Sequence, residues 1–305
     1  MMAAAAGTLL RGRERLAEPL ARHTSWRVGG PARRYYEPAD LADLCAFLAS
    51  LPADEPVFWL GLGSNLLVRD GGIAATVIAL AGALDRLQEP EPGVVEAEAG
   101  VPCAKVAKAA GRAGLTGAEF FAGIPGTMGG ALAMNAGAFG GETWGVVESV
   151  QTMDRRGALR WRPPTDYVVG YRSVQGPPGE WFTAARLRFV PGSGEAAGAR
   201  VRALLRRRSE TQPTGVPSGG SVFRNPPGDH AARLIEQCGL KGRRRGGAVV
   251  SEKHANFIVN AGGATAADIE GLMVEVQAVV ARVTGVALAP EVQLVGSARE
   301  EHTHD

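Results

Sequence analysis

Three kinds of feature are scarce in this chain of 305 residues. There are only three cysteines, Cys45, Cys103 and Cys238, and they form no CxxC pair, which argues against a disulfide framework or a structural zinc site. The 33 basic and 31 acidic residues give a net charge of +2, too small an imbalance for nucleic acid to be the main partner. No stretch approaches the roughly 18 uninterrupted apolar residues of a membrane span.

The start of the chain also lacks the order of a secretory signal. Met1–Leu10 is apolar with no basic residue ahead of it, and Arg11, Arg13 and Arg15 come after it, which is the reverse of that signal. Together these absences predict a cytoplasmic protein without a membrane span. The sequence does not give the oligomeric state, and a monomer is our expectation.

Glycine, by contrast, is abundant, with 42 residues at about twice the usual frequency of roughly 7%. The glycines follow no period and gather at particular turns, which indicates backbone that a ligand or another segment approaches closely. With 45% hydrophobic and 21% charged residues, the composition is that of a folded globular protein, and the length allows two or three domains.

Helix and strand patterns alternate in the first half. Asp40 is placed to cap a helix with regularly spaced apolar residues, and Pro102 suits the first turn of a second helix running to about Ala110. Strands are expected at Val57–Leu60, Thr76–Leu80 and Val94–Glu98. Between Val147 and Val190, short β-like runs separated by turn residues favour antiparallel sheet over βαβ repeats.

The last third is more helical. Arg200–Arg208 is a basic helical stretch, and Asp229–Cys238 is a short helix that stops at Gly239. Thr265 and Asp268 form a capping box that opens a long helix. Its buried face is predicted to hold Ile269, Leu272, Met273, Val276, Val279, Val280 and Val283. A further domain starting near residue 200 is expected.

Two glycine-rich segments are candidate nucleotide sites. Gly61, Gly63, Ser64 and Asn65 follow a predicted strand and offer backbone amides to phosphate oxygens, although an ordinary tight turn explains the same residues. Leu66 stands where a dinucleotide fingerprint needs its third glycine, so this is not a Rossmann loop. The second segment, 117–138, has small side chains, which indicates a flat ligand or a tight backbone crossing against it.

Ser221 follows a pair of glycines and precedes an apolar Val-Phe pair. No Gly-x-Ser-x-Gly elbow is present, which disfavours a Ser-His-Asp hydrolase, and Ser221 is better suited to donating a proton or a hydrogen bond.

Three further patterns carry little weight. Gly192–Ala197 matches a GxGxxA fingerprint, but no βαβ unit surrounds it, so we expect a linker between domains there. The arginine runs 206–208 and 243–245 are expected to be solvated faces. His302 and His304 lie in a tail too loose to fix coordination geometry, so no metal site is predicted.

Taken in order, the motifs resemble those of the UDP-N-acetylenolpyruvoylglucosamine reductases, also called UDP-N-acetylmuramate dehydrogenases. The resemblance spans nearly the whole chain, from about His23 to Gly296. It runs through residues 23–32, 61–70, 123–130, 134–138, 171–172, 220–226, 240–242, 251–257 and 290–292. The short segment between Arg172 and Trp181 resembles the shorter-loop branch of the family and leaves the substrate lid unassigned. Val174 departs from the serine that is usual there.

The resemblance implies an α+β fold. A two-part FAD-binding region of the vanillyl-alcohol oxidase/PCMH type would be followed by a C-terminal α+β substrate-binding domain. The implied parts are an N-terminal extension at 1–22, FAD-binding subdomains at 23–90 and 91–195, and a substrate-binding domain at 196–305.

It also implies a function. Non-covalent FAD, reduced by NADPH, would reduce the enolpyruvyl group of a UDP-sugar in peptidoglycan synthesis, a step of cell-wall biogenesis that supports cell shape and division. The family's catalytic positions map onto Arg172 and Glu291, which would stabilise negative charge, and Ser221, which would donate a proton. Asn225, Lys253 and His254 are candidate substrate contacts. The implied FAD contacts are Gly61, Gly63, Ser64, Asn65, Leu66, Gly123, Ile124, Pro125, Gly126, Thr127, Gly130, Asn135, Ala136 and Gly137.

Two rival functions stay open. A non-catalytic flavin-binding module is disfavoured because Arg172, Ser221 and Glu291 are all present. Another FAD-dependent oxidoreductase of the same superfamily would often hold its flavin covalently through His or Cys. His23, Cys103 and His254 are available, but they lie outside the flavin loops quoted above.

Overall fold

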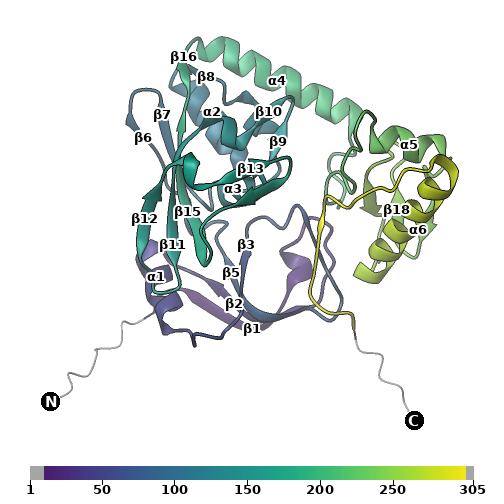
Figure 1. The fold of residues 1–305 in the computed structure, drawn as a ribbon, viewed down its shortest axis with the longest axis horizontal. Helices are drawn as coiled ribbons and strands as arrows, with labels where there is room; N and C mark the ends of the chain where they lie inside the picture. The colour runs from purple at the N-terminus through teal and green to yellow at the C-terminus, as the bar shows by residue number, and fades with distance from the viewer. Residues whose placement is uncertain (1–9, 300–305) are drawn as a thin grey trace. The chain divides into compact units, whose positions relative to one another are not determined.

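The computed structural model describes residues 10–299, which fall into two compact units (Figure 1). Unit 1 is built from the described residues up to Arg15 and from Tyr35–Gly61 and Thr76–Val201. Unit 2 is built from Leu16–Arg34, Leu62–Ala75 and the described residues from Arg202 onward. Each unit is therefore assembled from three separate segments of the chain.

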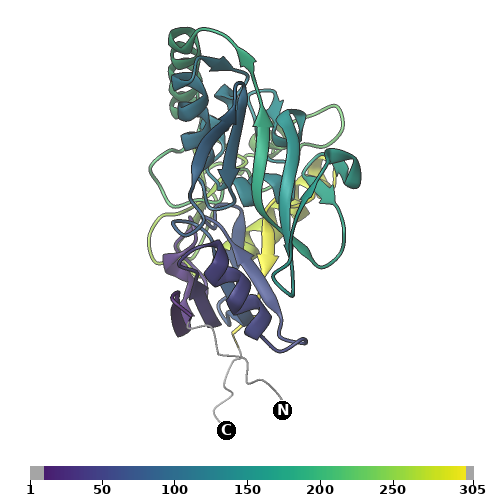
Figure 2. The same cartoon turned by 90° about the vertical axis from the view of Figure 1, so that its left-hand side faces the viewer.

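Unit 1 contains a five-stranded antiparallel sheet of order β12-β11-β15-β7-β6, whose neighbouring strands are visible in Figure 2. Its strands are β6 (Leu87–Glu91), β7 (Val94–Glu98), β11 (Val147–Asp154), β12 (Leu159–Arg162) and β15 (Glu180–Arg188). One core joins this sheet to α2 (Cys103–Arg112), η2 (Glu119–Gly123) and α3 (Met128–Met134). Short elements complete this part: β8 (Leu115–Thr116), β9 (Gly137–Ala138), β10 (Gly141–Glu142), η3 (Thr143–Val146), η4 (Pro164–Asp166), β13 (Val168–Gly170), β14 (Ser173–Gln175) and β16 (Val190–Pro191).

A second core of unit 1 surrounds α1 (Leu41–Ser50). Asp40 caps this helix by accepting a hydrogen bond from the backbone N–H of Asp43, as its sequence position predicts. The apolar run β3 (Val57–Leu60) pairs in parallel with β5 (Ile73–Ala79) and leads directly into Gly61. The four-stranded sheet has the order β1-β2-β5-β3, with β1 at Arg13–Pro19 and β2 at Pro31–Glu37. The boundary between the units falls inside β1, β2 and β5.

Unit 2 has a core of its own around the buried Trp26. Strand β4 (Leu66–Val68) pairs in parallel with β20 (Gln293–Val295). The other elements are η1 (Leu20–Arg22), α5 (Ala231–Gln237), β17 (Arg244–Arg245), β18 (Ala248–Val250), β19 (Ile258–Asn260) and α6 (Ala266–Thr284). Helix α4 (Gly194–Thr211) begins in unit 1 and ends in unit 2.

Several sequence predictions are confirmed. The strands Val57–Leu60 and Val94–Glu98 have the predicted bounds, and the region from Val147 to Val190 forms antiparallel sheet. The capping box of Thr265 and Asp268 opens α6.

Other predictions are wrong in detail. The linker expected at 192–197 is largely helical, because α4 starts at Gly194 and runs from unit 1 into unit 2, and the Ser193 hydroxyl accepts a hydrogen bond from the Ala196 N–H. Val283 belongs to the exposed side of α6, at 57% exposure. Helix α5 begins at Ala231, two residues later than predicted.

No metal-binding cluster and no helix able to cross a membrane occurs within residues 10–299. The tail histidines His302 and His304 lie outside the described residues.

Candidate active site

Unit 1 contains a cavity of about 330 Å³, at the lower end of the size range of small-molecule sites. All of its lining residues belong to unit 1. The walls are aromatic, from Trp59, Tyr167, Trp181 and Phe182, and the glycines Gly129 and Gly130 leave part of the lining without side chains. The shape and chemistry of this lining suit a flat ring system.

Two polar atoms in this lining have no hydrogen-bond partner among the described residues, although both are buried. They are the indole Nε1 of Trp59 and the hydroxyl of Tyr167. Burial raises the pKa of Tyr167 to about 12, so at neutral pH its hydroxyl keeps its proton and can donate it to a hydrogen bond. Because buried donors in proteins are almost always paired, these two indicate a ligand with acceptor atoms in this cavity.

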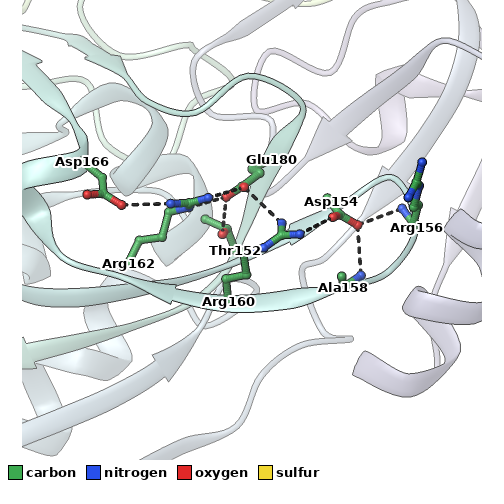
Figure 3. A network of polar contacts seen from close by, with 8 residues as sticks. All are labelled: Thr152, Asp154, Arg156, Ala158, Arg160, Arg162, Asp166 and Glu180. Atoms are coloured by element: carbon green, nitrogen blue, oxygen red, sulfur yellow. Dashed lines mark hydrogen bonds and ion pairs between the residues drawn. The ribbon is translucent and has the colours of Figure 1, made fainter.

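A network of ion pairs holds one wall of the cavity (Figure 3). The carboxylate of Glu180, which lines the cavity, accepts hydrogen bonds from Arg162 at 2.6 Å and from the Thr152 hydroxyl at 2.6 Å. Arg162 also donates to Asp166 at 2.9 Å, which ties down the turn immediately before Tyr167. The hydrogen bonds from Arg162 lower the pKa of Glu180 to about 2, so this carboxylate is charged at neutral pH.

Backbone lies closely packed where β3 meets the start of α3. A Cβ atom added to Gly61 would lie 2.5 Å from the Thr127 hydroxyl, so a larger residue there would require the Thr127 side chain to move. The backbone N–H groups of Met128 and Gly129 donate to Val101 and Ala99, at 2.9 and 2.8 Å. These contacts fix the predicted stretch 123–130 beside Gly61, with Thr127 and Gly130 in the cavity wall.

Asn135 and Arg172 also meet in unit 1. The Arg172 guanidinium donates to the backbone oxygens of Asn135 and Gly137, at 3.3 and 3.4 Å. Its Cζ lies 4.9 Å from the centre of the Tyr171 ring. Arg172 does not line the cavity described above.

In unit 2, the glycine loop contacts the C-terminal region. Gly63 has φ +59, and an added Cβ would meet the His23 carbonyl oxygen, so the loop conformation requires glycine. The Asn65 side chain donates to the backbone oxygen of Glu291 at 3.1 Å, and the Asn65 backbone oxygen accepts from Gln293 at 2.9 Å. The loop is thereby attached to the predicted acid.

Ser221 and Glu291 are connected through adjacent backbone. The Glu291 N–H donates to the Val222 oxygen at 2.8 Å, and Phe223 and Pro290 form an antiparallel bridge. The buried Asn256 supports the same segment, because its side chain both accepts from the Phe223 N–H at 2.9 Å and donates to the Phe223 oxygen at 2.8 Å. The Asn256 side chain thus supplies the two hydrogen bonds that the backbone of a neighbouring strand would otherwise give to Phe223, in the segment that carries Ser221.

The predicted substrate contacts lie in three different settings. The Asn225 side-chain oxygen accepts from the first N–H of α5, at 3.1 Å, and this orients its amide. The Lys253 ammonium donates to the Ser209 backbone oxygen on α4. His254 packs edge-on against Phe257 at 4.8 Å, and burial lowers its pKa, so it is neutral at pH 7.

Some contributors were missed from the sequence. Trp59, Tyr167, Glu180 and Trp181 line the cavity, yet they lie in ordinary strand and turn segments, and their grouping arises only in the fold. Asn256 carried a usable signal, since it is a polar residue between Ala255 and Phe257 just before a buried strand.

Comparisons with known proteins show which family the chain is similar to. The family model for an FAD binding domain matches residues 32–161, and that for the UDP-N-acetylenolpyruvoylglucosamine reductase C-terminal domain matches residues 212–295. The chain is 63% identical to the UDP-N-acetylenolpyruvoylglucosamine reductase of Alkalilimnicola ehrlichii, over 98% of this chain and 100% of the relative. It is also 63% identical to the enzyme of that name from Methylococcus capsulatus, over 92% and 93%.

A solved structure is similar over the same extent. The crystal structure of UDP-N-acetylenolpyruvylglucosamine reductase from Thermus caldophilus aligns with a TM-score of 0.81 and 35% identity, over 94% of this chain and 99% of that one. Full-length relatives, both domain matches and the fold agree. The chain therefore belongs to the UDP-N-acetylenolpyruvoylglucosamine reductase family.

Proposed function

We propose that this chain uses NADPH as its reductant and Ser221 as the proton donor in reducing its sugar substrate. As a family member, it is an FAD-dependent oxidoreductase that converts UDP-N-acetylenolpyruvoylglucosamine to UDP-N-acetylmuramate in peptidoglycan synthesis. The observation that supports the role of Ser221 is the backbone pairing of its segment with that of Glu291, which places a residue with a hydroxyl group and a residue with a carboxyl group on adjacent segments.

The residues of unit 1 fit an FAD molecule. The unpaired donors of Trp59 and Tyr167, and a cavity wall that includes Gly61, Gly129 and Gly130, support this. We propose that the cofactor is held non-covalently by the loop Gly61–Leu66, by Gly123–Gly130 and by the stretch from Ala136 to Gly137. When bound, FAD would supply a hydride received from NADPH, and the vinyl CH2 carbon of the enolpyruvyl group would accept it.

Charge then develops on the substrate at the other alkene carbon and spreads into its carboxylate. We propose that Arg172 offers its planar guanidinium to that carboxylate, as a rigid donor pair. Two backbone oxygens hold this guanidinium, so little reorganisation is needed when the charge forms. Glu291 would share this role.

Ser221 would complete the reaction by giving its proton to the carbon that carries the charge. A serine hydroxyl is a weak acid, so it can serve only if this carbon is strongly basic and is held within hydrogen-bond reach. The support of the Ser221 segment by Asn256 and Glu291 holds its backbone in place. Asn225, Lys253 and His254 are proposed to contact the UDP-sugar.

Replacing Ser221 by Ala tests this assignment. Under anaerobic conditions NADPH should bleach the yellow protein at the wild-type rate, and the enolpyruvyl sugar should restore the colour at least a hundredfold more slowly. Slowed bleaching with normal colour recovery would overturn the role given to Ser221.

Acid precipitation separates the proposal from its nearest rival. A tethered oxidase would keep its flavin in the pellet, whereas the proposed enzyme releases it.

We also propose the division into a 1–22 extension, FAD-binding parts at 23–90 and 91–195 and a substrate-binding part at 196–305. The monomeric state and cytoplasmic location remain predictions, to be tested by sedimentation and by cell fractionation.

A further inference from the structure

Asn135 is a buried polar residue at the end of helix α3, with 2% of its surface exposed. Its backbone is left-handed, with φ 44° and ψ 52°, a conformation that asparagine tolerates better than most residues. A buried amide needs partners for its donors and its acceptor, so its hydrogen bonds indicate what the residue holds in place.

The side chain of Asn135 is committed to the protein itself. Its Nδ2 group donates to the Gly170 backbone oxygen at 3.2 Å and to the Glu142 carboxylate at 3.0 Å. Its Oδ1 atom accepts from the Trp144 N–H at 3.1 Å. Both amide protons are therefore in use, and neither remains for a ligand.

The backbone oxygen of the same residue holds Arg172. It accepts from Arg172 Nη1 at 3.3 Å, while the Gly137 oxygen accepts from Nη2 at 3.4 Å. Tyr171 and Arg172 form the two-residue turn between β13 and β14, where Gly170 pairs with Ser173. Asn135 therefore bonds two parts of this hairpin. Its side chain donates to Gly170, and its backbone oxygen accepts from the Arg172 guanidinium.

Arg172 needs such support because its own backbone is also left-handed, with φ 54°. A non-glycine residue adopts this region at a cost and stays there only where its surroundings hold it. The hydrogen bond from Asn135 to Gly170 holds the residue directly before this turn in place.

We propose that Asn135 is a positioning residue for Arg172, setting the direction of the guanidinium toward the substrate carboxylate. This rests on the proposed function, since it deepens the role given there to Arg172. It assigns Asn135 to the substrate half of the reaction and not to holding the cofactor. Preorganised donors stabilise developing charge without reorganising, so a loosened guanidinium should slow only the step in which that charge forms.

Two substitutions test the proposal. Asn135→Gly keeps a left-handed backbone accessible and removes the amide, whereas Asn135→Asp keeps the shape but places an acceptor against Gly170 and Glu142. In single-turnover experiments, we expect reduction of the flavin by NADPH to stay within about twofold of wild type. Reoxidation by the enolpyruvyl sugar should slow about ten- to a hundredfold. First-order rate constants of the flavin signal do not depend on the yield of folded protein.

A double-mutant cycle separates positioning from general structural support. In an Arg172→Lys background, adding Asn135→Gly should slow sugar reduction by less than about twofold, because the guanidinium it would position is already gone. Glu142→Gln, which keeps an acceptor oxygen for Asn135, is the matched control and should behave as wild type. Should Asn135→Gly fail to fold, Glu142→Ala is expected to show a smaller slowing of the same half-reaction.

Several results would overturn the inference. They are equal slowing of both half-reactions, loss of FAD from the variants, or an undiminished effect of Asn135→Gly in the Arg172→Lys background. If the wild-type protein is not reoxidised by the enolpyruvyl sugar, the proposed function itself fails, which is a different outcome from any of these.

Discussion

The side-chain amide of Asn65 donates a hydrogen bond to the backbone oxygen of Glu291, 226 positions later in the sequence. One end of this bond lies in the glycine loop assigned to the cofactor, and the other lies at the residue assigned to the substrate. Both residues belong to unit 2, where β4 and β20 pair immediately after them. The loop and the acid are thus fixed to each other by a side chain as well as by strand pairing.

We expect Asn65→Ala to slow sugar reduction about ten- to a hundredfold, because displacing a catalytic group by about 1 Å has an effect of that order. Reduction by NADPH should change less, and stopped-flow absorbance of the flavin measures both steps. Gln293→Ala is the control, since the hydrogen bond from Gln293 to Asn65 is made by the backbone N–H and is kept in this variant. Equal losses in both steps would contradict a specific effect on Glu291.

The unpaired donor of Trp59 predicts a loss of flavin affinity when it is removed. Trp59→Phe keeps an aromatic wall but no N–H, so FAD should bind about fivefold more weakly, as expected for one hydrogen bond. Titration of the flavin-free protein, followed by flavin fluorescence, measures this. Trp161→Phe is the matched control, because Trp161 is exposed on β12 and stacks on Arg186 outside the cavity. Equal effects of the two changes would rule out the assigned contact.

Asn256 should be important for stability. In Asn256→Ala, the Phe223 N–H and oxygen lose their side-chain partners in a buried setting, at about 1–3 kcal/mol each, so the free energy of unfolding should fall by about 2–6 kcal/mol. Urea denaturation followed by circular dichroism measures it. Gln237→Ala, at an exposed position of α5, should change stability by less than about 0.5 kcal/mol. A loss below 1 kcal/mol for Asn256→Ala would show that the segment is held by other contacts.

Glu180 predicts a pH dependence of stability. Its pKa is lowered from 4.5 to about 2 in the folded protein, chiefly by Arg162, so its contribution is complete above pH 4.5 and is lost as the pH falls through 2. Glu180→Gln should lower the thermal midpoint at pH 7 and flatten its acid dependence between these values. Melting curves from pH 7 to pH 2 test this. Glu236→Gln is the control, because Glu236 forms an exposed ion pair with Lys241. An unchanged acid slope in Glu180→Gln would exclude this carboxylate as the cause.

Local elements of this protein follow from local sequence. The apolar run of β3 and the capping box of α6 are set by neighbouring residues, so both could be predicted with correct boundaries. The close packing at Gly61 could also be anticipated, although its cause, the approach of Thr127, could not.

Contacts between distant segments could not be predicted in this way. The rings of Trp59 and Trp181 lie 5.2 Å apart, and nothing within either strand indicates the other. The same holds for Asn135, where the motif suggested a cofactor contact, whereas its hydrogen bonds lead to Gly170 and Arg172. Contacts between distant segments therefore decide which groups of a motif bond to the protein and which can contact a ligand.

The parallel pairing of β4 with β20 has a consequence for synthesis in the cell. Residues 66–68 leave the ribosome long before their partner at 293–295. Strand β4 and the loop before it therefore lack this neighbour until residues 293–295 have been made. A truncation before residue 293 would thus remove the partner of residues 66–68, far from the truncation in sequence.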